Sequence, residues 1–370
     1  MKKHLIAAAV AVAVAAPAMA QNVTLYGTLD AGVASLSNVG AGNTTGKSAQ
    51  VFTDGAMSSS VWGLRGSEDL GGGLRATFNA ESDLSINNGT TSAAGYWRRA
   101  ANIGLAGGFG AVELGVKMNP VIATNAALMT TPGNNVSTMQ SAALGFSDFF
   151  TRNAITYTSP NMSGLTLQVQ HGMSNTSAAG GDMTAFSALY ASGPIEVRVA
   201  GQERNGPRND SGAHYGSVQP AAATGTTFDK STYVAGVKAT LGAWQVAAAM
   251  YQNEYNTAAG GAKTKRESTG LSASYQLSSA TRLGVARMES EGSTLTHAQA
   301  RYVLSKRTQL YAAYGQADNK GTTAYWPYAS NTNGFTGGTA APVFADGVPG
   351  AGGALNAKQR GYGVGLITSF

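Results

Sequence analysis

Residues 74–81, LRATFNAE, alternate strictly between two kinds of side chain. One series is apolar and the other is polar or charged: Leu74, Ala76, Phe78 and Ala80 against Arg75, Thr77, Asn79 and Glu81. Because successive side chains of a β-strand point to opposite faces, the segment predicts a strand with one apolar and one polar face. Residues 111–117 and 163–170 repeat the pattern, and only residues 123–129, inside a loop, tolerate a helix.

The connections between such segments are of two kinds. Tight turns rich in Gly, Pro or Ser lie near residues 69–73, 107–109, 160–164, 193–194, 241–243, 278–280 and 305–307. Mostly longer polar connections alternate with them, at residues 36–56, 85–95, 119–150, 174–183, 204–229, 255–265, 291–293 and 318–357, of which 291–293 is short. This rhythm predicts sixteen antiparallel strands with both chain ends on the side of the tight turns.

The composition restricts the fold class further. The chain has 370 residues with 49 glycines, no cysteine and 12% charged residues, against roughly 25% charge in soluble domains. After residue 20 it lacks an apolar run long enough for a membrane-spanning helix. A soluble β-sandwich also alternates, but it does not predict the short and long rhythm of connections. We therefore expect an all-β protein, a transmembrane β-barrel of the bacterial outer membrane.

The two ends of the chain carry signals of their own. Lys2 and Lys3, the apolar run after them and the A-x-A pattern at residues 18–20 predict a cleaved signal peptide over residues 1–20. The mature chain, residues 21–370, would then be a single barrel domain with a net charge of +4 instead of +6. The apolar alternation at the carboxy terminus is similar to a barrel-assembly signal, and its members are Tyr362, Val364, Leu366 and the terminal Phe370.

Aromatic residues near the predicted strand ends suit the girdles that membrane barrels place at the two lipid interfaces. They are Tyr26, Trp62, Tyr96, Trp97, Tyr157, Tyr190, Trp244, Tyr251 and Tyr302. Ordinary packing explains any single one of them equally well.

Four segments resemble the general porins of Gram-negative bacteria, in particular the β-proteobacterial branch. They are QNVTLYGTLDAGV at 21–33, WGLRGSEDLGGGL at 62–74, GFGAVELG at 108–115 and VLSKRTQLYAAY at 303–314. The resemblance implies a sixteen-stranded barrel, a homotrimer and passive diffusion of small hydrophilic solutes. It also implies that the third long loop, residues 119–150, folds inward and narrows the pore.

The resemblance also points to the residues that line the narrowing. Arg99 and Arg152 match pore-lining bases of the family, and Arg75 and Lys117 join them because each lies on the polar face of its strand. Alternation alone would place Arg98 inward instead of Arg99. Val61 and Val116 stand where the family usually has a basic residue, and residues 119–147 contain no charged residue.

Cations without opposing carboxylates at a narrow point would enrich anions. We therefore expect an outer-membrane diffusion porin with an anion preference, whose partners are inorganic anions, other small solutes, membrane lipids and lipopolysaccharide. The alternatives are a surface-interaction barrel, which is an adhesin or receptor with a blocked lumen, and a solute-specific porin with an aromatic track.

The sequence shows no pattern of an enzyme or a cofactor site. The spacing of His171, His214 and His297 does not suit a metal site, and the sequence contains no phosphate-binding loop or nucleophile elbow, so we expect no enzyme and no cofactor. Without a larger basic cluster than residues 263–266, we expect no nucleic-acid partner.

Overall fold

The computed structural model describes residues 23–39, 47–91, 95–131, 149–173, 182–204, 229–255, 262–320 and 358–370. The predicted signal peptide, residues 1–20, and most of the longest loops lie outside these ranges. No helix among the described residues is long and apolar enough to cross a membrane.

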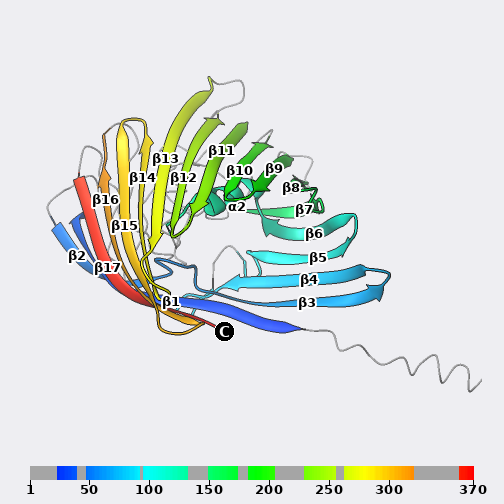
Figure 1. The fold of residues 1–370 in the computed structure, drawn as a ribbon, viewed down its shortest axis with the longest axis horizontal. Coiled ribbons are helices and arrows are strands. Elements are labelled where there is room, and N and C mark those ends of the chain that lie inside the picture. Colours follow the sequence, from blue (N-terminus) through cyan, green and yellow to red (C-terminus); the bar gives the residue numbers. More distant parts are fainter. Residues whose placement is uncertain are drawn as a thin grey trace, which may run out of the picture.

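The described residues form seventeen strands and one helix in this part of the chain (Figure 1). The strands are β1 (Thr24–Val39), β2 (Lys47–Asp54), β3 (Val61–Gly71), β4 (Leu74–Asp83), β5 (Ala100–Gly107), β6 (Gly110–Met118), β7 (Phe150–Thr158), β8 (Leu165–Gly172), β9 (Met183–Ser192), β10 (Ile195–Arg204), β11 (Lys230–Leu241), β12 (Trp244–Tyr255), β13 (Thr264–Gln276), β14 (Thr281–Ser290), β15 (Ser293–Val303), β16 (Thr308–Asp318) and β17 (Lys358–Ser369). The helix is α2 (Pro120–Leu128), between β6 and β7.

All strands pair antiparallel in one sheet, and β17 pairs with β1, which closes the sheet into a barrel. Backbone bonds between Gly27 and Phe370 extend that closing ladder to the last residue. β2 and β3 both pair with β1, one after the other along the same edge, so together they act as a single strand with an interruption. The closed wall therefore has sixteen strands, as the rhythm of connections predicts.

The interruption between β2 and β3 is fixed by the buried carboxylate of Asp30. Its Oδ2 accepts hydrogen bonds from the backbone N–H groups of Met57 (2.6 Å) and Ser58 (2.7 Å). Its Oδ1 accepts one from the hydroxyl of Tyr311 (2.8 Å). In this break the Gly55 N–H donates to the backbone carbonyl of Asp30 at 2.8 Å, and the Asp30 carboxylate supplies the acceptor for the N–H groups of Met57 and Ser58.

The seven tight turns lie where the sequence predicts them, and the long connections differ mainly at the first. That loop was expected over residues 36–56, but β1 and β2 pair as far as Val39 and Lys47, which leaves only residues 40–46 as a connection. The second connection extends to residue 99 instead of 95, because β5 begins at Ala100. At the first connection, backbone hydrogen bonding thus continues into segments whose polar side chains suggested a loop.

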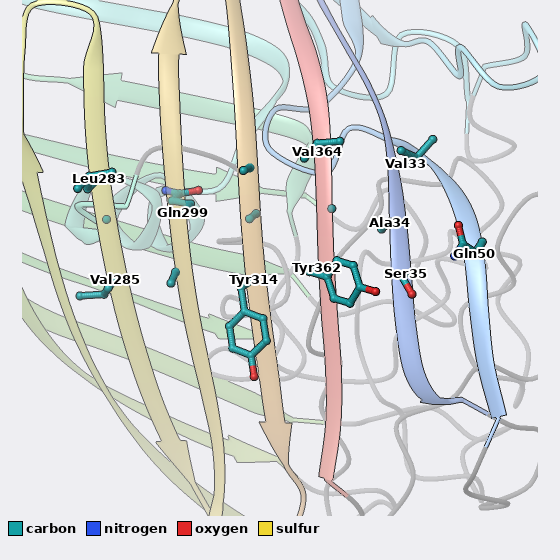
Figure 2. Close-up of a pocket in the computed structure, with 15 residues that line it drawn as sticks. Val33, Ala34, Ser35, Gln50, Leu283, Val285, Gln299, Tyr314, Tyr362 and Val364 are labelled. Carbon is teal, nitrogen blue, oxygen red and sulfur yellow. The ribbon is translucent and has the colours of Figure 1, made fainter.

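The two faces of the wall differ as the alternation predicts. Large apolar side chains at alternate positions are exposed on the outer face, for example Ile103 (63%), Leu271 (62%) and Val33 (58%). An outward apolar groove of about 710 Å³ crosses β14, β15, β16, β17 and β1 (Figure 2). Tyr314 and Tyr362 border this groove. Because these side chains point away from the lumen, the outer face suits contact with lipid chains.

Most of the predicted aromatic girdle lies on this outer face. Tyr157, Tyr190, Trp244 and Tyr302 are each 40% exposed or more and lie near the strand ends at the tight turns. On the loop side, Trp62, Tyr96 and Trp97 form one ring cluster with centroids 4.8–6.2 Å apart. The girdle prediction is wrong for Tyr26 and Tyr251, which belong to the inner face and hydrogen-bond there.

Candidate functional site

The inner face carries helix α2, which lies against strands β8–β12. Its apolar side chains Val121, Ile122 and Leu128 are 0–2% exposed and pack in a cluster with wall residues that include Val234 and Tyr251. A helix with so few polar residues requires an apolar surface to cover it, and the small residues of these strands provide one.

Polar contacts hold both ends of α2. Asn119 caps the helix, with its Oδ1 2.9 Å from the backbone N of Val121, and donates through Nδ2 to Gln202 Oε1 at 2.8 Å. Lys238 Nζ donates to the carbonyl of Ala127 at 3.2 Å, which places a cation at the negative end of the helix dipole. Gln202 is near the loop end of β10 and Lys238 near the turn end of β11, so α2 runs down the wall.

The prediction that the third loop folds inward covers residues 119–150. Residues 132–148 of this loop lie outside the described residues, so the infolding of the whole loop stays a prediction. The described part contributes no charged side chain to the lumen, because residues 119–131 contain none.

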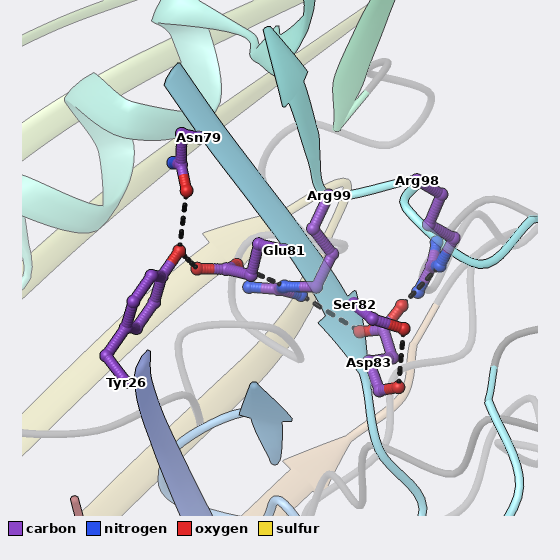
Figure 3. Close-up of polar contacts among 7 residues, drawn as sticks. All are labelled: Tyr26, Asn79, Glu81, Ser82, Asp83, Arg98 and Arg99. Atoms are coloured by element: carbon purple, nitrogen blue, oxygen red, sulfur yellow. Dashed lines mark hydrogen bonds and ion pairs between the residues drawn. The ribbon is translucent and has the colours of Figure 1, made fainter. Parts of the chain in front are cut away.

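Across β1, β3, β4 and the loop before β5, a charged network lies on the same inner face (Figure 3). Arg99 Nε donates to Glu81 Oε1 at 2.7 Å, and Arg99 Nη1 donates to Asp83 Oδ1 at 3.1 Å. Glu81 also accepts a hydrogen bond from the hydroxyl of Tyr26 at 2.9 Å. The guanidinium of Arg65 lies 5.0 Å from the centre of the Tyr26 ring. We call these residues, together with Arg98, the Arg99 network.

The choice between Arg98 and Arg99 has an unexpected outcome, because both pair with Asp83. Arg98 Nε donates to Asp83 Oδ2, on the other oxygen of the carboxylate that Arg99 contacts. Neither arginine belongs to a strand, since β5 begins at Ala100. Strand alternation therefore does not apply to either of them. Val61 lies opposite Asp83 in the register and brings no charge, so the positive partners of Asp83 come from the loop before β5.

The other three predicted lumen residues do not join this network. Lys117 Nζ pairs with Glu113 Oε2 on the same strand, β6. Arg75 is exposed at the β3–β4 turn, roughly 20 Å along β4 from Glu81. Arg152 is exposed at a bulge, because Thr151 and Ala154 pair with Lys117 and Gly115 and leave two residues against one. The alternation of inward and outward side chains along β7 is therefore interrupted at Arg152.

The expectation of unopposed cations is thus wrong for Arg99 and Lys117, since each has a carboxylate partner. Sequence reasoning missed another cluster on β10 and β11, where Glu196 pairs with two cations. Arg198 Nη2 lies 2.6 Å from Glu196 Oε2, and Lys238 Nζ lies 3.1 Å from Glu196 Oε1. The alternation of Glu196 and Arg198 with exposed Val197 and Val199 would have revealed this inward pair.

No three His, Asp or Glu side chains of the described segments are grouped so that they could hold a metal ion. At the carboxy terminus, Tyr362 (61%), Val364 (55%), Leu366 (42%) and Phe370 (45%) are exposed on the outer face. Their role as an assembly signal stays a prediction.

Comparisons with known proteins agree with this barrel. A family model described as Gram-negative porin matches residues 7–322. Outer membrane porin protein 32 of Delftia acidovorans is 41% identical over 120 residues, which cover 32% of this chain and 33% of that protein. Major outer membrane protein P.IB of Neisseria lactamica is 34% identical over 212 residues, or 54% of this chain and 58% of that protein. The alignments thus span about a third and somewhat over half of these curated relatives.

Solved structures show the same fold. The anion-selective porin from Comamonas acidovorans superposes with a TM-score of 0.73 and 22% identity, covering 95% of this chain and all of that one. The outer-membrane expressed OmpT of Vibrio cholerae gives a TM-score of 0.64 at 13% identity, with 95% and 98% of the two chains covered. With a matching family model over most of its length and a closed barrel of sixteen strands, the chain belongs to the Gram-negative porin family and is a β-barrel of the outer membrane.

Proposed function

We propose that the protein is a diffusion porin that lets small hydrophilic solutes and ions pass through a water-filled lumen, with a preference for anions. The positive excess on the inner wall beside α2 carries this proposal. There Arg198 and Lys238 share the single carboxylate of Glu196. Sixteen strands make a barrel wide enough for an aqueous channel, so wall charges act on ions in confined water.

In this proposal the third loop forms the constriction, with α2 as its docked part. The contacts of α2 with Gln202 and Lys238 support this role, because they fix an uncharged segment against one wall. The Arg99 network lies on strands β1, β3 and β4 and on the loop before β5, away from the strands that carry α2. Ions would then pass between an uncharged segment and a charged wall.

We assign the four predicted lumen residues separate roles. Arg99 is held by Glu81 and Asp83, so it orders the wall more than it adds net charge. Lys117 is similarly balanced by Glu113. Arg75 is exposed and would act as a hydrated charge beside the turn-side mouth, and Arg152 lies exposed near the loop side.

The remaining assignments are also part of the proposal. The chain acts as a passive channel and not as an enzyme, after removal of a signal peptide over residues 1–20. It assembles as a homotrimer in contact with outer-membrane lipids and lipopolysaccharide. The apolar outer face supports the lipid contact, since many of its exposed side chains are large and apolar.

Conductance of the purified, unheated protein in planar bilayers tests the pore, and reversal potential in a potassium chloride gradient tests its selectivity. We expect steady conductance steps and a reversal potential of the sign given by chloride preference. A preference for potassium would refute the anion proposal. Absence of steady steps would refute the pore and favour a surface-interaction barrel with a blocked lumen.

A pair of variants tests the charge that carries the proposal. Arg198→Gln leaves Glu196 with one cation, so we expect a smaller anion preference and an open pore. Arg287→Gln is the matched control, because Arg287 pairs with Glu289 on the outer face and both side chains are more than half exposed. An equal effect of both variants would refute a local action of the inner wall.

A further inference from the structure

A second group of cations lies on the inner wall close to the tight turns, apart from the Arg99 network. Arg282 on β14 and Arg301 on β15 are direct partners in the register. Both belong to the inward series, since Leu283 and Val285, at odd offsets from Arg282 along β14, are exposed on the outer face and Arg301 is paired with buried Tyr311. Arg282 is the second residue of β14, and Arg301 is followed by only two residues of β15.

Two like charges placed directly opposite each other across a sheet destabilise it. Among the described residues, neither arginine has a carboxylate within 4.0 Å, whereas Arg99, Lys117, Arg198 and Lys238 on the inner wall each have one. The repulsion between Arg282 and Arg301 therefore lacks the compensation that these four cations have. An anion between the two guanidinium groups would supply it.

Neutral amides hold the two side chains in place. Arg282 Nη2 donates to Gln245 Oε1, and Arg301 Nη1 donates to Gln309 Oε1 at 3.2 Å. Amide oxygens orient a guanidinium group without cancelling its charge. The buried Nε atoms of both arginines have no hydrogen-bond partner, so each fork keeps donors for a further acceptor.

The Asp30 carboxylate, which is hydrogen-bonded to Tyr311, is a negative charge that acts on Arg301. Its two oxygens already accept from the Tyr311 hydroxyl and from the backbone N–H groups of Met57 and Ser58. Asp30 is 0% exposed, and the hydrogen bonds that its carboxylate accepts come from other groups, so it balances part of one charge without occupying a guanidinium donor.

We propose that Arg282 and Arg301 form a binding subsite for a small tetrahedral oxyanion, of the class of inorganic phosphate, on the lumen wall beside the turn-side mouth. Paired guanidinium groups match such an ion because each offers N–H donors in a planar fork. The site rests on the proposed pore only in that the anion reaches it through the lumen. It would hold phosphate transiently at the mouth instead of at the constriction.

Calorimetric titration of the detergent-solubilised protein with inorganic phosphate tests the site directly. We expect one binding event per chain, weakened at least about tenfold in Arg282→Gln/Arg301→Gln, because each lost contact is a charge-assisted hydrogen bond. Arg282→Lys/Arg301→Lys keeps the charge but loses the fork, and should bind with intermediate affinity. Lys265→Gln/Arg287→Gln removes two cations that face away from the lumen, and should bind like the parent protein.

Thermal melting gives a second measurement that also reports on folding. The Gln variant loses the repulsive pair, so we expect it to fold, and phosphate should raise the melting temperature of the parent protein only. In bilayers, phosphate added on the turn side should reduce the chloride current of the parent protein and have little effect on the Gln variant.

Two results would overturn the subsite: no phosphate binding by the parent protein, or equal binding by the parent protein and the Gln variant. Failure of the pore has a different signature, because a parent protein without steady conductance can still bind phosphate in the calorimeter. Steady conductance with no phosphate effect in any assay refutes the subsite alone.

Discussion

Leu128→Ala should release the turn-side end of α2 from the lumen wall without unfolding the barrel. Leu128 is 0% exposed and packs in the cluster with Val121 and Ile122. A Cβ atom at Gly236 would come within 2.7 Å of Leu128 Cδ1, so the leucine fills the space that this glycine leaves on β11. A buried Leu→Ala change of this kind costs about 2–5 kcal/mol.

That loss falls on the docking of α2, because the backbone ladder of the wall does not depend on Leu128. A cost of about 2–5 kcal/mol raises the undocked population of the helix by roughly 30-fold to several thousandfold. Hydrogen exchange in residues 120–128 measures this population, and we expect markedly faster exchange in the variant. Open-channel current noise should rise as well, since the helix is then free to move in the lumen.

The control is Leu167→Ala on β8, whose side chain is 39% exposed on the outer face. It removes the same atoms and should leave exchange in residues 120–128 and the current noise unchanged. Equal exchange of α2 in the parent protein and Leu128→Ala would refute the reasoning that apolar docking of this residue holds the helix. A large fall in the melting temperature of Leu128→Ala would show instead that α2 supports the whole barrel.

Three further changes test other parts of the wall. Asp83→Asn removes a carboxylate and leaves its two arginine partners with one more uncompensated positive charge. Such a charge about 8 Å from a passing ion should raise the ratio of anion to cation permeability about twofold after screening at ~0.1 M salt. An unchanged reversal potential would contradict this. Tyr311→Phe removes the hydroxyl bonded to Asp30 and should cost about 1.5–3 kcal/mol in denaturant unfolding, whereas a similar loss in Tyr314→Phe, at an exposed contact, would argue against a special role for the buried bond. Phe370→Ala should lower the fraction of chain folded in the outer membrane yet refold normally in detergent, because the backbone bonds to Gly27 remain; equal folded fractions in cells would contradict an assembly role.

The barrel itself was predictable from the sequence, because its determinants are local. A strand that separates lipid from water must alternate in polarity, and residues 74–81 do so within eight positions. Turns that connect neighbouring strands require Gly, Pro or Ser at specific places, so the number of strands follows from the spacing of these turns. The first loop was placed wrongly because polar side chains also suit the loop end of a strand, where backbone pairing continues to Val39.

The balance of charge in the lumen was decided only by the tertiary structure. Alternation shows that a side chain faces inward, but it does not show which residues of distant strands meet there. Asp83 meets two arginines from the loop before β5, and Glu196 meets Lys238 from the next strand, so some predicted free cations are paired. Arg282 and Arg301 became neighbours through strand register. The sequence thus determined the barrel wall, because the two faces of a strand alternate every residue and this pattern is local. The closure of the sheet determined which charges meet in the lumen.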